Sequence, residues 1–275
     1  MAGKVYFCPT PIGNLEDITL RALRVMKEAD LILAEDTRHS MPLLKHYDIH
    51  TPLESYHKFN EEEKIGGILK RLDEGKDIAL ISDAGMPGVS DPGAVLLSAL
   101  LKEGRPFEVL PGPSAHVCAS LIAALDEGRY LFWGFLPQKH GARVKTLEEL
   151  ADIPVPVIFY EAPHRIQRFA EDVLAALGNR PLIFVREISK MYEERVETTA
   201  ADFLQNMEDF TIKGEFAVVL MPGEGEEEEI DIAAALRERM DGGESPSKAV
   251  KSVAKALNLP CLLYTSDAAD DCCRV

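Results

Sequence analysis

The sequence predicts an α/β fold made of two α/β domains with a cleft between them, followed by a short C-terminal helical appendage. Up to about residue 112, short apolar runs rich in β-branched and aromatic residues have the composition of strands: KVYFCP, DLILAE, DIALIS and FEVLPG. Helical stretches separate them. In one of these, Ile65, Ile68, Leu69 and Leu72 repeat along a single helix face. Four or five strands separated by helices predict a parallel sheet with right-handed crossovers.

A second α/β segment follows the sequence PGPS at 111–114, where two prolines and a glycine interrupt regular structure. Its expected strands are RYLFWGFL, VPVIFYEA, PLIFVREI and GEFAVVLMP, and the helix before PLIFVREI is closed by Gly178. We therefore expect domains over 1–112 and 113–223. An acidic linker, GEGEEEEID, then leads into a partial helical module within 224–260, whose second helix begins near Ser245 and Pro246.

The C-terminal residues 261–275 share no periodicity with the chain before them. The stretch from Cys261 to Asp271 resembles the translation of a transposase-derived sequencing-library adapter, which reads CLLYTSDAAD. An ordinary C-terminal end is the alternative. We interpret the segment as an assembly artefact and leave it out of the functional argument.

Bulk properties disfavour several classes of protein. No apolar run approaches the roughly 20 residues that span a bilayer. The N-terminal sequence lacks a basic region followed by an apolar core, so we expect a cytoplasmic protein. The five cysteines form no metal-ligand spacing, and we predict neither a metal site nor a structural disulfide. The net charge of −16 disfavours non-specific binding to nucleic acid, because an acidic surface repels phosphates.

Candidate ligand sites lie in the loops after the predicted strands, because open parallel sheets bind ligands outside the carboxyl ends of their strands. The most specific loop is LISDAGMPGVSDPG at 80–93, whose glycines and polar residues can present backbone N–H groups to a polar ligand. It lacks the lysine of a GxxxxGK[ST] phosphate loop and the spacing of a GxGxxG dinucleotide loop. A merely tight connection explains the glycines but not the concentrated polarity.

The loop PTPIGNLEDIT at 9–19 is a second candidate. Gly13 would let the backbone approach a ligand, and Asp17 or Thr19 would cap the next helix. A turn followed by a capped helix explains the same residues.

Two further loops have two readings each. LAEDTRH at 33–39 gathers Glu35, Asp36 and Arg38, which form either a ligand site or a solvated salt-bridge group. In LPGPSAH at 110–116, Ser114 either caps the following helix or offers its N–H to a carboxylate or an adenine edge.

Taken together, these segments closely resemble the ribosomal RNA small subunit methyltransferase I family, within the tetrapyrrole methylase fold. The matching strings run in order over roughly residues 5–222: PTPIGNLEDIT, AEDTRHS, LISDAGMPGVSDPG, LPGPSA, GFLP, FYEAPHR, RE at 186–187 and KGEF at 213–216. The resemblance implies a two-domain protein, usually a homodimer, that binds S-adenosylmethionine between its domains. It also implies 2′-O-methylation of a cytidine near the decoding centre in 16S rRNA, within the small ribosomal subunit. A basic cleft that engages this folded ribonucleoprotein is compatible with the acidic charge.

The resemblance further implies which residues contact the cofactor. Most belong to the loops of the N-terminal domain, and two residues of the second domain close over the cofactor. The implied positions are Pro11, Gly13, Asp83, Ala84, Gly85, Met86, Pro87, Ser90, Asp91, Gly112, Ser114 and Ala115, with Leu136 and Tyr160 from the second domain.

Methylation of a ribose hydroxyl benefits from a group that accepts its proton, because the hydroxyl is a poor nucleophile. The candidate bases at predicted strand ends are Glu161, Glu187, Asp36 and His164. The residues expected to hold flanking phosphates are Arg38, Arg165 and Arg186, with Lys213 beside a strand entry.

Two other functions stay open. A methyltransferase of the same fold could act on a tetrapyrrole, although such a substrate needs a wide apolar trough and the arginines of EAPHR and VREI favour RNA. A non-catalytic S-adenosylmethionine-binding module or sensor could carry the same loops.

Overall fold

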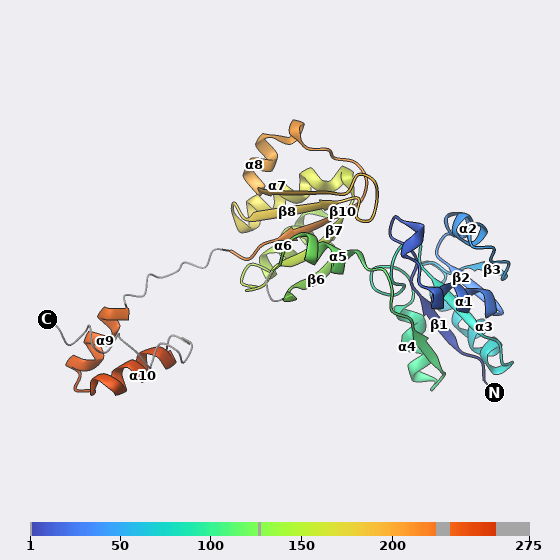
Figure 1. Ribbon diagram of the computed structural model, residues 1–275, viewed down its shortest axis with the longest axis horizontal. Helices are drawn as coiled ribbons and strands as arrows, with labels where there is room; N and C mark the ends of the chain where they lie inside the picture. Colours follow the sequence, from blue (N-terminus) through green and yellow to red (C-terminus); the bar gives the residue numbers. More distant parts are fainter. Residues whose placement is uncertain (1, 126–127, 224–231, 257–275) are drawn as a thin grey trace. The chain divides into compact units, whose positions relative to one another are not determined.

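The computed structural model describes residues 2–125, 128–223 and 232–256 of the chain. Its contacts divide the chain into two compact units, Met1–Gly223 and Glu224–Val275. The first unit contains two five-stranded sheets with their helices, so the predicted α/β class is confirmed (Figure 1). The boundary at residue 112 falls inside this unit and stays a prediction. The acidic linker over 224–231 and the adapter-like segment lie outside the described residues.

The first sheet is entirely parallel, as predicted, with strand order β3-β2-β4-β1-β5. Its strands are β1 (Val5–Cys8), β2 (Leu31–Ala34), β3 (Leu53–Ser55), β4 (Ile78–Ile81) and β5 (Phe107–Val109). The short strand β3 is absent from the four predicted runs, because three residues with one apolar side chain give no pattern to detect.

Helices cover both faces of the first sheet. The helices are α1 (Leu20–Glu28), α2 (Thr37–His46), α3 (Glu61–Asp73) and α4 (Ala94–Lys102). Side chains of α1 and α2 share one core with Ile32 and Ala79, whereas α3 and α4 share the other with Leu33 and Leu80. The helical face predicted in 65–72 belongs to α3, where Ile68 is buried in the second of these cores.

The second sheet is mixed, with strand order β6-β7-β10-β8-β9, and only β6 and β7 pair in parallel. Its strands are β6 (Leu131–Phe135), β7 (Val157–Glu161), β8 (Pro181–Arg186), β9 (Glu194–Thr199) and β10 (Phe216–Leu220). Strand β9 was not predicted, because its sequence ERVETT is polar and its side chains are mostly exposed at a sheet edge.

Four helices pack on the second sheet, namely α5 (Ala115–Ile122), α6 (His140–Glu149), α7 (Ile166–Leu177) and α8 (Ala200–Gln205). Helices α6, α7 and α8 share the core built around Phe159, while α5 lies on the opposite face with Ile158. Helix α7 ends at Leu177, followed by Gly178 with a φ of 74°, as predicted. Short 3-10 helices occur at Leu15–Asp17, Pro163–Arg165 and Met207–Asp209.

The second unit contains α9 (Ile232–Asp241) and α10 (Pro246–Ala256), which pack on one another. Helix α10 begins at Pro246, as its sequence predicts. Within the described residues, no helix combines the length and apolarity needed to cross a membrane.

The loops after β1, β4 and β5 pack directly against one another. Thr10 and Gly85 form an isolated antiparallel bridge, with N–H to carbonyl distances of 2.9 and 3.0 Å. A Cβ added to Gly112 would lie 2.3 Å from Cγ of Pro9, so only a glycine fits there without displacement. These contacts fix the carboxyl edge of the first sheet.

We expect Gly112→Ala to destabilise the chain by about 1–3 kcal/mol, because the added methyl group overlaps the Pro9 ring. The matched control is Gly66→Ala within α3, where a Cβ meets nothing within 4 Å and alanine favours the helix by about 1 kcal/mol. Urea denaturation of both variants measures the difference. Equal stability of Gly112→Ala and the wild type would contradict this account of the loop packing.

Candidate active site

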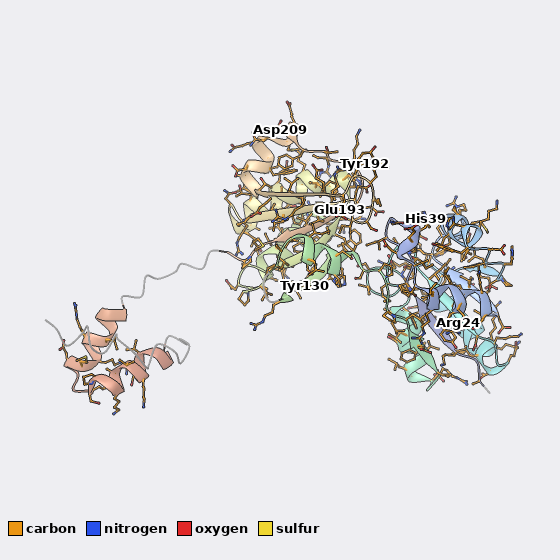
Figure 2. All side chains as sticks on the ribbon, viewed as in Figure 1. Arg24, His39, Tyr130, Tyr192, Glu193 and Asp209 are labelled. Carbon is orange, nitrogen blue, oxygen red and sulfur yellow. The ribbon has the colours of Figure 1, made fainter. Side chains whose placement is uncertain are left out.

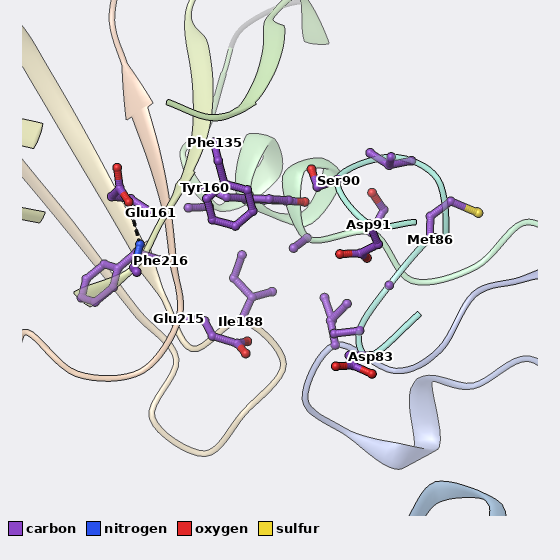
Figure 3. Close-up of a pocket in the computed structure, with 18 of the residues that line it drawn as sticks. Asp83, Met86, Ser90, Asp91, Phe135, Tyr160, Glu161, Ile188, Glu215 and Phe216 are labelled. Atoms are coloured by element: carbon purple, nitrogen blue, oxygen red, sulfur yellow. Dashed lines mark hydrogen bonds between the residues drawn. The ribbon is translucent and has the colours of Figure 1, made fainter. Parts of the chain in front are cut away.

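A cavity of about 450 Å³ lies in the first unit, where loops of the first sheet meet strands of the second. The first sheet contributes residues that follow β1, β2, β4 and β5, and the second contributes the ends of β6 and β7, a residue after β8 and the start of β10. The lining residues are Ile12, Glu35, Asp83, Ala84, Gly85, Met86, Val89, Ser90, Asp91, Ser114, Ala115, Phe135, Tyr160, Glu161, Ala162, Pro163, Ile188, Gly214, Glu215, Phe216 and Ala217 (Figure 3).

The loop at 82–93, predicted as the most specific site, forms one wall of the cavity. Gly85, Gly88 and Gly93 all have positive φ, so the chain turns sharply where side chains would be strained. The end of the loop is also fixed by helix α3, because the buried carboxylate of Glu61 accepts the Gly93 N–H at 2.9 Å. The loop therefore forms a preshaped wall.

Carboxylates gather in this wall. Glu35, Asp83 and Asp91 all line the cavity. Burial, followed by the neighbouring charges of Glu35 and Asp83, raises the pKa of Asp91 to about 7. Burial and the charge of Asp83 also raise the pKa of Glu35. A bound cation would therefore be stabilised on this side of the cavity, and Asp91 can exchange a proton near neutral pH.

Aromatic side chains form part of the opposite wall. Phe135 and Tyr160 make an edge contact with ring centroids 5.7 Å apart. The Tyr160 hydroxyl accepts the backbone N–H of His116 at 2.9 Å, and burial raises the pKa of Tyr160 to about 12. Tyr160, in β7, is therefore neutral, and its hydroxyl is fixed against the start of α5.

Glu161 is one of the residues that line the cavity, and it is buried, with 3% of the residue exposed. Its Oε1 accepts the Ala162 N–H at 2.9 Å and lies 3.0 Å from Nε of Arg165. Burial raises the pKa of Glu161 even though these two contacts act in the opposite direction. A carboxylate with a raised pKa at a cavity wall is suited to accepting a proton.

Several predicted cofactor contacts lie outside the lining of this cavity. A Cβ at Gly13 would lie 2.4 Å from Cγ of Lys190, and Gly112 packs on Pro9, so both glycines permit close packing of the chain against itself. Leu136 is buried in the core around Phe159. Pro11 and Pro87 do not line the cavity but neighbour residues that do. The predicted positions that do line it are Asp83, Ala84, Gly85, Met86, Ser90, Asp91, Ser114, Ala115 and Tyr160.

Two predicted catalytic carboxylates also lie outside the lining. The Glu187 carboxylate accepts hydrogen bonds from Lys190 Nζ at 2.8 Å and from the Glu215 N–H at 2.9 Å, which lower its pKa. Asp36 caps α2 and pairs with the exposed Arg38, and these hydrogen bonds lower the pKa of Asp36 to about 2. Both carboxylates are therefore weaker bases than Glu161.

The predicted arginines are all engaged within the chain. Arg165 pairs with Glu161, and Arg186 pairs with Glu194 at 2.9 Å. The loop after β8 is further fixed where Glu193, labelled in Figure 2, accepts the Ser189 N–H at 2.8 Å. Lys213 offers its carbonyl to Arg186 at 3.5 Å.

The sequence argument missed several lining residues. In the cluster at 33–39, the sequence argument favours Asp36 as a candidate base, but Glu35 is the residue that lines the cavity. Successive side chains of an extended chain point in opposite directions, so only one of the two neighbours can face the cavity. Gly214 to Phe216 had no chemical signal beyond the motif string KGEF, and Ile188 and Ala217 lie just outside the motif strings. Phe135 was visible only as part of GFLP.

Comparison with known proteins places the chain in a family. A sequence model of the Tetrapyrrole (Corrin/Porphyrin) Methylases matches residues 4–204. A ribosomal RNA small subunit methyltransferase I from Streptococcus pyogenes serotype M1 is 37% identical over 260 residues, covering 93% of this chain and 91% of that protein. The protein of the same name from Halalkalibacterium halodurans is 44% identical over 227 residues, covering 82% and 78%. The chain belongs to the ribosomal RNA small subunit methyltransferase I family.

The family resemblance predicted from the motifs is thus confirmed. Solved structures share the fold at lower identity. A diphthine synthase has a TM-score of 0.62 at 14% identity, covering 80% of this chain and 90% of that one. A uroporphyrin-III C-methyl transferase from Thermus thermophilus, complexed with S-adenyl homocysteine, has a TM-score of 0.56 at 22% identity, covering 79% and 97%. The two likenesses establish the tetrapyrrole methylase fold of this family member.

A buried ion pair supports the segment after β6. Arg143 contacts the Asp172 carboxylate through Nε and donates to the carbonyls of Pro137 and Gln138 at 3.3 and 3.0 Å. Both side chains are buried.

We expect Asp172→Asn to destabilise the chain by about 3–5 kcal/mol, because it leaves the Arg143 charge buried without a counter-charge. The double variant Arg143→Met, Asp172→Leu removes both charges and should lose less stability. Glu149→Gln, which disturbs only an exposed pair with Lys145 on the same helix, should change stability by less than about 0.5 kcal/mol. Urea denaturation measures all three, and a loss in Asp172→Asn no larger than in Glu149→Gln would contradict the prediction.

Proposed function

We propose that this chain transfers the methyl group of S-adenosylmethionine to the 2′-hydroxyl of a cytidine ribose in 16S rRNA, within the small ribosomal subunit. The observation that carries the proposal is the cavity, whose carboxylate wall and aromatic wall meet at the carboxyl ends of β2, β4, β6 and β7. The relatives from S. pyogenes, H. halodurans and Thermotoga maritima, all named ribosomal RNA small subunit methyltransferase I, support rRNA as the substrate.

The residues of the cavity fit S-adenosylmethionine. Glu35, Asp83 and Asp91 give the wall the negative charge that a sulfonium and an amino group require. The backbone at Ser114 and Ala115 begins α5 and can meet a carboxylate or an adenine edge. When bound, the cofactor supplies a methyl group activated by the positive sulfur.

The chain's own groups must orient the ribose hydroxyl and accept its proton. Glu161 is the favoured base among the candidates, because it lines the cavity and burial raises its pKa. Arg165 holds the Glu161 carboxylate in place at 3.0 Å. Alignment of the hydroxyl with the methyl carbon then provides much of the acceleration.

The acidic charge favours an assembled subunit over free RNA as the substrate. A net charge of −16 repels exposed phosphates, so specific contacts to a folded ribonucleoprotein surface are needed for affinity. In the same proposal the protein acts in the cytoplasm as a homodimer. The exposed side chains Val117 and Leu121 on α5, the latter 78% exposed, support a protein contact on that helix.

We expect labelled S-adenosylmethionine to transfer its methyl group to a cytidine of small subunits isolated from cells that lack this activity. Glu161→Gln should lower kcat by about 100- to 10,000-fold, the usual contribution of a general base, while the Kd for S-adenosylmethionine changes less than about twofold. Glu197→Gln, which removes an exposed carboxylate on β9, is the matched control and should keep the wild-type rate.

Parallel reactions with free 16S rRNA and with a porphyrinoid separate the alternative functions. Label on the porphyrinoid alone would replace rRNA by a tetrapyrrole as the substrate. Bound cofactor without transfer to any acceptor would indicate a sensor. Wild-type turnover in Glu161→Gln would exclude Glu161 as the base.

We also expect the affinity for S-adenosylmethionine to rise with pH between 6 and 8. Asp91, with a pKa of about 7, is neutral below this range and anionic above it, so the attraction for the sulfonium grows as the proton leaves. If the cation lowers that pKa by about one unit, from about 7 to about 6, Kd falls by roughly fivefold between pH 6 and 8. Titration calorimetry at several pH values measures the change.

The neutral product S-adenosylhomocysteine is the control ligand, and its Kd should depend on pH much less. Asp91→Asn should flatten the profile for S-adenosylmethionine. A profile in Asp91→Asn as steep as in the wild type would remove Asp91 as its source.

A further inference from the structure

Strand β6 contains an irregularity that decides which way its last side chain points. Leu131 and Phe132 pair with Val157 and Ile158 of β7, but the next pairs are Gly134 with Phe159 and Phe135 with Tyr160. Trp133 is therefore an extra residue with no partner of its own. Gly134, with a φ of 83°, carries the altered backbone direction. This is a β-bulge, a device that re-aims side chains beside functional sites.

The bulge moves Phe135 from the core face of the sheet to the cavity face. Side chains of a regular strand alternate, so Phe135, three positions after Phe132, would lie on the opposite face from it. Phe132 lies on the face of Ile158 and Tyr160, away from the core around Phe159. Because of the extra residue, Phe135 also lies beside Tyr160 and lines the cavity, while Leu136 enters the core around Phe159.

Phe135 is held in this position, but about half of it is exposed to solvent. Its ring contacts Tyr160, yet 54% of the residue is exposed. The segment that follows is fixed by Arg143, which donates to Pro137 and Gln138, and by Arg165, which donates to the Leu136 carbonyl at 2.9 Å. An apolar ring kept rigid and half exposed at a cavity is a surface prepared for a partner.

We propose that Phe135 is the stacking platform for the base of the nucleotide that is methylated, a role that rests on the proposed function. A nucleotide must leave its stack to bring its ribose into a cavity, and an aromatic ring can replace the lost stacking. Figure 3 shows Phe135 beside Tyr160, across the cavity from Asp83. Phe135 is thus a positioning residue that lines the cavity on the side away from Asp83.

Two observations favour the substrate base over the adenine of the cofactor as the occupant. The cofactor is a small molecule that the cavity can enclose. About half of Phe135 is exposed to solvent, and a nucleotide that is still joined to a large RNA needs such an accessible surface. Lys139, exposed just beyond Phe135, also supplies a positive charge for the flanking backbone. Stacking tolerates any base, so specificity for cytidine must come from other contacts.

The test compares Phe135→Ala with Phe135→Trp on methyl transfer to small subunits. Phe135→Ala should lower kcat/KM for the subunit by roughly 5- to 150-fold, the range that loss of one stacking aromatic gives. The Kd for S-adenosylmethionine should stay within twofold and the melting temperature should be unchanged. Phe135→Trp should restore the rate to within about threefold of the wild type. Leu101→Ala, which removes an exposed apolar side chain from α4, is the matched control and should be silent.

A second substrate isolates the stacking contact. Subunits are reconstituted with RNA that lacks the base at the mapped methylation position but keeps its ribose and 2′-hydroxyl. The wild-type rate should fall to that of Phe135→Ala on normal subunits, and Phe135→Ala should lose little more, because base and ring act as a pair.

The outcomes separate this inference from the function beneath it. No transfer by the wild type to any subunit overturns the proposed function. Normal transfer by the wild type together with an equal rate in Phe135→Ala overturns the platform alone. A weakened Kd for S-adenosylmethionine in Phe135→Ala, with an unchanged KM for the subunit, assigns the ring to the cofactor and also overturns the platform.

Discussion

The close packing of three loops at the carboxyl edge of the first sheet is the constraint on which the site depends. Thr10 and Gly85 exchange backbone hydrogen bonds, and the Thr10 hydroxyl donates to the Ser82 carbonyl at 3.0 Å. Gly112 allows Pro9 to lie against the third loop. Because each loop braces the next, the backbone of the acidic wall is fixed before any ligand arrives, and the carboxylates there are held close together despite their mutual repulsion.

The carboxylates around the cavity differ in their burial and in whether an arginine pairs with them. On the acidic wall, burial, followed by the charges of Glu35 and Asp83, raises the pKa of Asp91. Beside the aromatic wall, each buried carboxylate has an arginine: Glu161 has Arg165, and Asp172 has Arg143. The carboxylates of the acidic wall attract a cationic ligand, whereas the arginine–carboxylate pairs fix the ends of β6 and β7.

The second sheet adds its own connections to the first set of loops. Lys190 packs over Gly13 and pairs with Glu187 and Glu215, and the Ser189 hydroxyl donates to Asp17. Glu187 thereby serves the frame of the cavity. The contacts of Glu187 with Lys190 and with the Glu215 N–H lower its pKa, and its role as a base stays a prediction.

The sequence by itself determined the α/β class, the parallel first sheet, the polar glycine loop at 82–93 and the family, since strand composition, helix periodicity and long motifs are local properties of the chain. Tertiary structure decided which members of each motif reach the cavity. Glu35 lines the cavity, whereas its neighbour Asp36 caps helix α2. A one-residue bulge turns Phe135 toward Tyr160. The physical reason is that side-chain direction and pKa depend on strand register, burial and charged neighbours far apart in the chain, which no local pattern records.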